Sequence, residues 1–315
     1  MIKPMLATLA DEPFDSKEWI FEIKWDGYRA LANKTKQVQL LSRNQKSFNA
    51  RFPKIVEELE KLPGRFVVDG EIVILDKQGR SHFQLLQNYQ KEKIGTPFYY
   101  LFDILSYEGK DLTDVPLIER KKILHKLLET TRSKYLRYSD HIEEKGKAFF
   151  QKAKKKGLEG IIGKKKTSLY STTRSSNWLK IKAYLRQEVV IGGYTEPKGS
   201  RKKIGALLVG VYEKGKLLYA GHVGGGFNEK LLTDVYTQMQ KWISPKCPFQ
   251  NEPHPNSPVT WLKPKLVCEV SFAEWTRDGI LRQPIFKGMR IDKPAKQVVR
   301  ELPKTVRKSE SPQRT

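Results

Sequence analysis

Residues 19–29 read Trp-Ile-Phe-Glu-Ile-Lys-Trp-Asp-Gly-Tyr-Arg, and this stretch has the pattern of a strand that presents one lysine at its end. Apolar residues at every second position predict a β-strand over 19–25, with Ile20, Glu22 and Lys24 on one face. The opposite face carries Trp19, Phe21, Ile23 and Trp25. Lys24 ends this strand beside an Asp-Gly turn, so we expect its side chain to be held more rigidly than one on a loop. A rigid, partly desolvated lysine can act as a nucleophile once its ammonium group loses a proton.

The charge balance of the chain indicates a polyanionic partner. Its 315 residues include 59 Lys and Arg against 35 Asp and Glu, which gives a formal net charge of +24. Nucleic acid fits this excess better than a membrane surface, because the sequence has neither an amphipathic anchor nor a lipidation signal. No apolar run has the length of a transmembrane span, and the N-terminus has no signal-peptide core. We therefore expect a cytoplasmic protein without a membrane partner.

The length of the chain predicts two domains, and the residue pattern changes near Leu185 from mixed strands and helices to short strands with turns. The first, residues 1–185, mixes strands with helices. Its strand candidates are 19–25, 66–75, 98–105 and 160–165. Its helix candidates are 52–62, which is stopped by Pro63-Gly64, and a segment that begins near Pro116.

The second domain, residues 186–302, has short strands separated by turns. Its strand candidates are 187–195, 205–213, 216–223 and 265–273, and one helix with Asn228 as its N-cap interrupts them. Such a pattern favours a small Greek-key barrel of the OB type. Residues 303–315 have the composition of a basic, disordered tail.

Two acidic clusters accompany apolar strands. Asp69-Gly70-Glu71 lies inside the apolar run 66–75, where two carboxylates need compensation. Alternation puts Asp69 and Glu71 on one face. Either a hard cation binds there, or the strand lies at a sheet edge and its acids face water. Glu159, which precedes the apolar run 160–165, is by itself weak evidence for a site.

Two basic clusters lie further along the chain. In Trp178-Leu179-Lys180-Ile181-Lys182 both lysines share one face with Trp178, and their repulsion calls for an anion such as phosphate between them. The alternative is a basic strand at a sheet edge, which opposes aggregation. Arg290-Ile291-Asp292-Lys293 has only the pattern of a charged surface turn when it is taken alone.

The order of these clusters says more than any one of them. Lys-x-Asp-Gly-x-Arg, Asp-Gly-Glu, Glu-Gly-Ile-Ile-Gly-Lys, Trp-x-Lys-x-Lys and Arg-x-Asp-Lys follow one another at 24–29, 69–71, 159–164, 178–182 and 290–293. The series resembles the covalent nucleotidyltransferases, most closely ATP-dependent DNA ligases, and within them the ligase module of bacterial end-joining ligases. Lys-Pro-Met-Leu-Ala at 3–7 and Phe-Lys-Gly-Met-Arg at 286–290 support that subgroup. The resemblance covers residues 3–302.

The resemblance implies an adenylation domain of antiparallel sheets with flanking helices, followed by an OB-fold domain. It implies that Lys24 attacks the α-phosphate of ATP to form lysyl-AMP, that AMP passes to the 5′-phosphate of a DNA strand, and that a 3′-hydroxyl then displaces it. Lys180 and Lys182 would grip the α-phosphate. Glu71 and Glu159 would hold Mg²⁺ or Mn²⁺, with Glu71 also near the ribose.

The same resemblance implies the remaining contacts to ATP. Phe102 would stack on adenine, with Glu22 and the Ile23 backbone at the polar edge of the base. A purely structural core position is the alternative for Phe102. Arg29 would contact the ribose or the nick phosphate, and Arg43 a phosphate. Once the OB domain closes about a hinge at Tyr184–Gln187, the pyrophosphate would be met by Arg290, Asp292 and Lys293.

The expected substrate is nicked or broken duplex DNA, with a Ku-like end-binding protein as a further candidate partner, and we expect a monomer. In a ligase without added domains, DNA would be held by the basic surface. The candidates are Lys152, Lys154, Lys155 and Lys156, Arg201-Lys202-Lys203 and the tail, while Lys164, Lys165 and Lys166 are assigned to phosphates or the DNA backbone.

Three alternatives to a DNA ligase stay open at this point. The chain can be an RNA ligase or an RNA-capping guanylyltransferase, which share the same covalent chemistry. It can also be a nucleic-acid-binding protein with a relict nucleotide pocket. Completeness of the five clusters disfavours the last alternative, because a relict should have lost at least one charged group.

Overall fold

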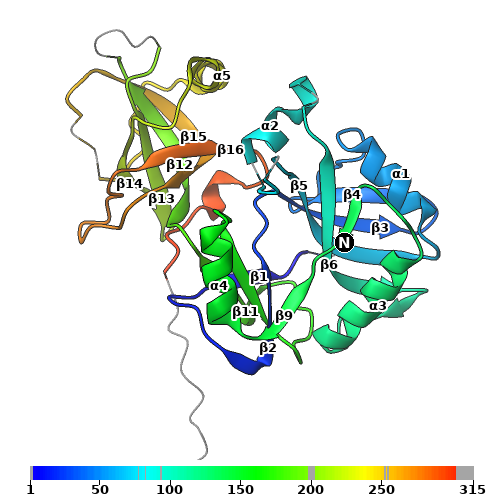
Figure 1. Ribbon diagram of the computed structural model, residues 1–315. Helices are drawn as coiled ribbons and strands as arrows, with labels where there is room; N and C mark the ends of the chain where they lie inside the picture. The colour runs from blue at the N-terminus through cyan, green and yellow to red at the C-terminus, as the bar shows by residue number, and fades with distance from the viewer. Residues whose placement is uncertain are drawn as a thin grey trace, which may run out of the picture. The chain divides into compact units, whose positions relative to one another are not determined.

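The computed structural model describes residues 3–76, 78–81, 83–92, 94–197, 203–251, 253 and 255–302. The chain divides into two compact units, the first containing the described residues up to Ala183 together with Leu302, and the second spanning Tyr184–Glu301 (Figure 1). Both units mix strands with helices, and most strand pairs are antiparallel, which confirms the expected α+β class. Arg201, Lys202 and the tail at 303–315 lie outside the described residues.

The first unit contains two sheets, of which the first carries the predicted lysine strand. Its order is β1-β11-β10-β2-β9. The bounds are β1 Leu6–Leu9, β2 Ser16–Ile23, β9 His141–Glu144, β10 Gly160–Lys165 and β11 Arg174–Lys182. Helix α4, Gly146–Lys155, covers one face of this sheet. There it contributes to an apolar cluster that includes Phe21, Phe150, Ala153, Ile161, Leu179 and Ile181.

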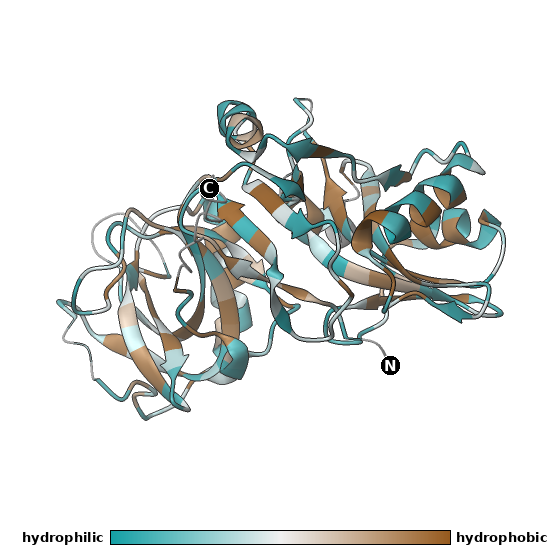
Figure 2. Ribbon diagram, turned by 90° about the horizontal axis from the view of Figure 1, so that it is seen from below, coloured by the Kyte–Doolittle hydropathy of each residue, from teal (hydrophilic) through white to brown (hydrophobic). Residues whose placement is uncertain are grey.

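The second sheet has the order β4-β3-β5-β6-β7, with β8 beside β6. Its bounds are β3 Tyr28–Lys34, β4 Val38–Ser42, β5 Phe66–Ile74, β6 Pro97–Tyr107, β7 Lys110–Asp111 and β8 Leu136–Tyr138. Three helices pack against one face of it, namely α1 Pro53–Lys61, α2 Phe83–Glu92 and α3 Leu117–Glu129. In Figure 2 these helices carry both apolar and polar stretches, as expected for helices that bury only one face.

The remaining faces of the two sheets meet in a shared apolar cluster. Ile20 of β2 and Trp178 of β11 come from the first sheet, and Leu31 of β3 and Phe102 of β6 come from the second. All four side chains are buried. Charged residues two positions away from them on these strands share the same face and are therefore brought between the two sheets.

Strand β2 follows the predicted alternation up to its last residue. Phe21 packs on the α4 side, whereas Ile20 packs in the cluster between the sheets. The strand ends at Ile23, so the assignment of Trp25 to the face of Phe21 is wrong. Trp25 instead stacks on Tyr100 of the second sheet, with ring centroids 3.8 Å apart and planes at 24°.

The second unit is the expected OB-type barrel. Its sheet has the order β14-β13-β12-β15-β16, and the Phe286 N–H near the start of β16 donates to the Gly225 carbonyl just after β14. The bounds are β12 Arg186–Thr195, β13 Leu207–Glu213, β14 Lys216–Val223, β15 Val259–Ser271 and β16 Ile285–Arg290. Helix α5, Glu229–Met239, begins where predicted, because the Asn228 side chain accepts the Leu231 N–H at 2.8 Å. Short 3-10 turns cover Gln240–Trp242 and Ala295–Gln297.

The segment between the units is shorter than the predicted hinge Tyr184–Gln187. Strand β12 begins at Arg186, and Gln187 is buried with its amide donating to the Val299 carbonyl. Tyr184 and Leu185 are each 46 % exposed, and the Leu185 carbonyl accepts the Phe272 N–H at 3.1 Å, while a hinge in this segment stays a prediction. Among the described residues no helix has both the length and the apolar character needed to cross a membrane.

Candidate active site

Lys24 and Lys182 lie in one row across the first sheet, with Gly160 between them. The Lys24 N–H donates to the Gly160 carbonyl at 3.0 Å, and Gly160 is in register with Lys182. Gly160 has φ 149°, and a Cβ there would lie 2.1 Å from the Ile181 carbonyl oxygen. Only glycine fits this position. No side chain therefore separates the two lysines within the row.

Two further rows of the same face lead from the lysines into the core. Glu22, Ile162 and Lys180 form the next row, and Ile20, Lys164 and Trp178 form the one after it. The last row is buried, whereas Lys180 and Lys182 are half-buried. Strand β11 lies between β1 and β10, so the alternative of a basic sheet edge is wrong.

Glu159 is the ion-pair partner of Lys24. The Lys24 Nζ lies 2.5 Å from Glu159 Oε1, with side-chain exposures of 20 % and 4 %. The Glu159 carbonyl accepts the Ala183 N–H at 2.9 Å, which fixes the turn ahead of β10. A nearly buried carboxylate thus pairs with an ammonium group that is still partly exposed to solvent. The two residues are 135 positions apart in the sequence.

Arg29, and not a hard cation, compensates Asp69. Its Nε and Nη2 donate to the two Asp69 oxygens at 2.6 Å each, and the Tyr170 hydroxyl donates to the same carboxylate at 2.6 Å. Burial opposes the charged guanidinium, but Asp69 raises the pKa of Arg29 above its usual value. The cation that compensates the Asp69 carboxylate is therefore a guanidinium group, and a hard cation on this face stays a prediction for Glu71 alone. Because β5 lies between β3 and β6, the alternative of an edge strand is wrong.

Glu71 is half-buried and in register with both Arg29 and Tyr100, on the side of the second sheet that faces the first. Within the described part of the chain, no group of three or more His, Cys, Asp or Glu side chains has the arrangement of a metal site. A cation held here would therefore need ligands from a bound molecule as well.

Phe102 is 7 % exposed and lies in the cluster between the sheets. The Arg29 guanidinium lies 4.5 Å and the Lys164 Nζ 4.1 Å from its ring centroid. The rings of Phe102 and Trp178 form a T-shaped pair, with centroids 6.1 Å apart. These contacts fit the core alternative left open for Phe102, and stacking on adenine stays a prediction.

Glu22 is the centre of a buried charge network that the sequence did not reveal. Its oxygens accept from Lys121 at 2.8 Å, from Lys164 at 3.0 Å and from the Ser139 hydroxyl at 3.1 Å. Burial alone would raise the pKa of Glu22, but Lys121 and Lys164 lower it below its usual value. The sequence offered one sign that Lys121 is buried, because this residue falls on the apolar stripe of α3 between Leu117 and Leu124.

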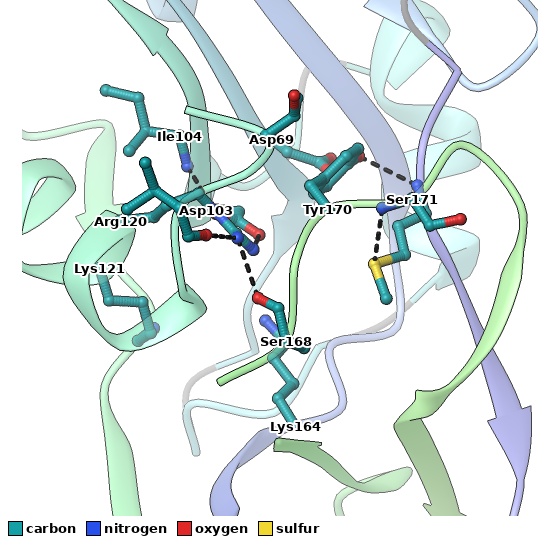
Figure 3. A network of polar contacts seen from close by, with 12 residues as sticks. Asp69, Asp103, Ile104, Arg120, Lys121, Lys164, Ser168, Tyr170 and Ser171 are labelled. Carbon is teal, nitrogen blue, oxygen red and sulfur yellow. Dashed lines mark hydrogen bonds and ion pairs between the residues drawn. The ribbon is translucent and has the colours of Figure 1, made fainter. Parts of the chain in front are cut away.

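Lys164 does not lie at a DNA-facing surface. Its side chain is 2 % exposed, and burial lowers its pKa to about 8 although Glu22 opposes this. Figure 3 shows Lys164 and Lys121 near the buried pair of Arg120 with Asp103, which also joins α3 to β6. The assignment of Lys164 to DNA or phosphate contact is therefore wrong. Lys165 pairs with Glu18, and Lys166 pairs with Glu143.

Arg290 and Lys293 belong to a buried charge cluster of the second unit. Arg290 donates to both oxygens of Asp292 at 2.9 and 2.8 Å and lies 3.6 Å from Glu269, while Lys293 pairs with Glu188. Burial would raise the pKa of Glu188, but Lys293 and Arg290 lower it to about 2. Side-chain exposures of 14 % for Arg290 and 6 % for Lys293 contradict a simple surface turn.

Two predicted contacts come from backbone and turn positions. Ile23 ends β2 in register with Ile161. Arg43 is half-buried in the turn after β4, which closes through the Ser42 N–H to the Lys46 carbonyl at 2.8 Å. Their roles toward ATP stay predictions.

Family models cover both units. The model described as ATP dependent DNA ligase domain matches residues 4–182, and the model described as ATP dependent DNA ligase C terminal region matches residues 200–293. A solved structure of mycobacterial DNA ligase D complexed with ATP and MES is 34 % identical, with a TM-score of 0.71 and coverage of 95 % of this chain and 98 % of that one.

Curated relatives agree with these matches. The multifunctional non-homologous end joining protein LigD of Pseudomonas aeruginosa is 44 % identical over 310 residues, which cover 96 % of this chain but only 37 % of the relative. The SPbeta prophage-derived DNA ligase-like protein LigB of Bacillus subtilis is 29 % identical over 92 % of this chain and 99 % of its own length. With the site geometry and the two family matches together, the chain belongs to the ATP-dependent DNA ligases.

Proposed function

We propose that this chain forms lysyl-AMP on Lys24 from ATP and uses it to join DNA strands. The observation that carries the proposal is the row Lys24–Gly160–Lys182, in which the central glycine places no side chain between the two lysines. Neighbouring strands are about 4.8 Å apart, so the two backbones stand about 10 Å from each other. A phosphate fits between side chains at that spacing. The mycobacterial relative of known structure was solved with ATP.

The chemistry follows from the neighbours of Lys24. Its ammonium must lose a proton before the nitrogen can attack, and Glu159 Oε1 at 2.5 Å is placed to accept that proton. The nitrogen then forms a bond to the α-phosphorus while the bond to pyrophosphate breaks, and pyrophosphate leaves with the electron pair. Lys180 and Lys182 would neutralise charge on the α-phosphate oxygens during this step.

A divalent cation, Mg²⁺ or Mn²⁺, is part of the proposal. Mg²⁺ is commonly held by one or two carboxylates together with substrate phosphates. Glu159, in the turn ahead of β10, and Glu71, on β5 of the second sheet, would provide those two carboxylates without a larger cluster of acids among the described residues. The cation would supply charge neutralisation at the phosphates. Arg29, Arg43, Phe102, Glu22 and the Ile23 backbone would hold the rest of ATP, with Arg290 and Lys293 at the pyrophosphate.

We further propose nicked or broken duplex DNA as the substrate and end joining as the context. AMP would pass from Lys24 to the 5′-phosphate, and the 3′-hydroxyl would then form the phosphodiester bond and release AMP. The name of the Pseudomonas relative supports end joining, although this chain spans only 37 % of that protein. A bacterial cytosolic location, a monomeric state and a Ku-like partner belong to the same proposal.

Labelling with ATP that carries ³²P at the α-phosphate tests the covalent step. We expect label on the protein from ATP, none from GTP, and none on Lys24→Ala, whereas the exposed-lysine control Lys36→Ala should label like the wild type. Label from GTP would instead indicate a guanylyltransferase. Absence of label together with intact DNA binding would indicate a non-catalytic binding protein.

A sealing assay tests the substrate. Nicked DNA duplexes should be sealed with ATP and Mg²⁺ or Mn²⁺, and single-stranded RNA should not. Sealing confined to RNA would replace the proposal with an RNA ligase. Addition of a Ku-like protein to linear duplexes with cohesive or blunt ends then measures whether end joining is stimulated.

A further inference from the structure

We propose that Ser139 is a positioning residue for the nucleophile, linking the ionised Glu22 carboxylate to the indole of Trp25 and so fixing the direction of Lys24. This inference rests on the proposed role of Lys24. Ser139 lies between β8 and β9, where the chain passes from the second sheet to the first.

The backbone of Ser139 is fixed on both sides. Its N–H donates to the Leu101 carbonyl of β6 at 2.7 Å, and its carbonyl accepts from Lys121 of α3 at 3.0 Å. The residue is 1 % exposed. The hydroxyl can therefore move only by rotation about one side-chain bond.

The charge of Glu22 sets how that hydroxyl points. An ionised carboxylate only accepts hydrogen bonds, so the Ser139 hydroxyl must donate its single proton to Glu22 Oε2, at 3.1 Å. The indole N–H of Trp25 only donates, and it reaches the same hydroxyl oxygen at 3.4 Å. Both bonds are satisfied together only while Glu22 is an acceptor. Lys121 and Lys164, on either side of Glu22, favour that ionised form.

Trp25 connects Ser139 to Lys24, because it is the next residue in the chain after Lys24. Its ring stacks on Tyr100, and its N–H is directed by Ser139. On the other side, the Lys24 N–H is tied to the Gly160 carbonyl of the first sheet. Lys24 is therefore held between a contact to its own sheet and, through the next residue, contacts to the opposite sheet. Loss of the Ser139 bond should loosen Lys24 without removing any group that touches ATP.

A double-mutant cycle separates positioning from general packing. Ser139→Ala removes the hydroxyl, and Trp25→Phe keeps a ring for Tyr100 but removes the N–H. We expect each to lower the maximal rate of lysyl-AMP formation about tenfold, as for one lost oriented hydrogen bond. The ATP concentration at half-maximal rate should change less than about twofold, since no side chain proposed to bind ATP is replaced and Glu22 keeps its bonds from Lys121 and Lys164. The double variant should match either single variant.

A buried serine elsewhere in the same unit provides the control. Ser168 is 3 % exposed, and its hydroxyl oxygen has no hydrogen-bond partner among the described residues. Ser168→Ala should form lysyl-AMP at the wild-type rate. Wild-type rates in Ser139→Ala, or losses that multiply to about a hundredfold in the double variant, would overturn the inference. If Ser139→Ala does not fold, a wild-type rate in Trp25→Phe alone would overturn it.

Fluorescence gives a readout that needs no ATP. The chain has six tryptophans, and the difference between the wild type and Trp25→Phe isolates Trp25. Ser139→Ala should shift the emission of Trp25 but leave the Trp25→Phe spectrum unchanged, and no shift would contradict the contact. If the wild type formed no lysyl-AMP, the proposed function would fail, while this spectrum would still test the Ser139–Trp25 link.

Discussion

The Lys24 ammonium nitrogen lies 2.5 Å from Glu159 Oε1, and Glu159 directly precedes the Gly160 that separates Lys24 from Lys182. One short turn thus supplies both a carboxylate for the nucleophile and the glycine that lies beside it. The backbone bond from the Lys24 N–H to the Gly160 carbonyl keeps the two features together. A single substitution at Glu159 should affect the rate of lysyl-AMP formation, and one at Gly160 should affect the stability of the first unit.

Glu159→Gln should slow lysyl-AMP formation while leaving the fold intact. The amide keeps the shape of the side chain but is a poor proton acceptor, and general-base groups typically contribute about 10²–10⁴ in rate. Single-turnover labelling with ATP measures the effect. Glu57→Gln on α1, where the side chain is 55 % exposed, is the matched control. A wild-type rate in Glu159→Gln would remove this residue from the chemistry.

Gly160→Ala should destabilise the first unit and abolish labelling. The new Cβ would lie 2.1 Å from the Ile181 carbonyl oxygen, at a φ that favours glycine. Overpacking of this kind costs about 1–3 kcal/mol, and the backbone strain adds to it. Gly215→Ala is a control for the strain alone, because Gly215 also has positive φ but has open space around it. Equal melting temperatures for the two variants would contradict this account of Gly160.

Lys164 should make stability depend on pH in the alkaline range. Burial lowers its pKa from 10.5 to about 8, so between these values the unfolded chain binds more protons at this residue than the folded chain. Its contribution to stability therefore rises as the pH rises through this window. The melting temperature of the wild type should increase relative to that of Lys164→Met from about pH 7.5 to about pH 10. Lys165→Met, on the half-exposed neighbour, is the control for removing a lysine charge at this end of β10.

The strand around Lys24 and the N-cap of α5 could be predicted because they depend on neighbours in sequence. Strand β3 was missed, since it lies inside its sheet and buries residues on both faces, which removes the alternating pattern. The partners of Asp69 and Glu22 were missed for a different reason. Arg29 is 40 positions from Asp69, and Lys121 is 99 positions from Glu22. Periodicity says which face a charge lies on, but only the folded chain shows what meets it there.

Four exposed lysines at the end of α4 should contribute to DNA binding through counterion release. They are Lys152, Lys154, Lys155 and Lys156. Replacing all four with alanine should reduce the slope of log affinity against log salt by about 3–4, if each contacts one phosphate. A variant that replaces four other exposed lysines has the same net charge and serves as the control, namely Lys36, Lys110, Lys122 and Lys126. Equal slopes in the two variants would show that position on the surface does not matter.

Arg290→Ala should slow lysyl-AMP formation more than it slows sealing of a nick that already carries AMP. Arg290 is now held by Asp292 and lies near Glu188 and Glu269, so its charge is balanced within the second unit. If it meets the pyrophosphate of ATP, it acts only while pyrophosphate is present, and the sealing step has none. Arg282→Ala, on an exposed arginine of the same unit that pairs with Glu274, should leave both steps unchanged. Equal losses in the two steps for Arg290→Ala would instead assign Arg290 to the stability of the barrel, through the carboxylates it neutralises.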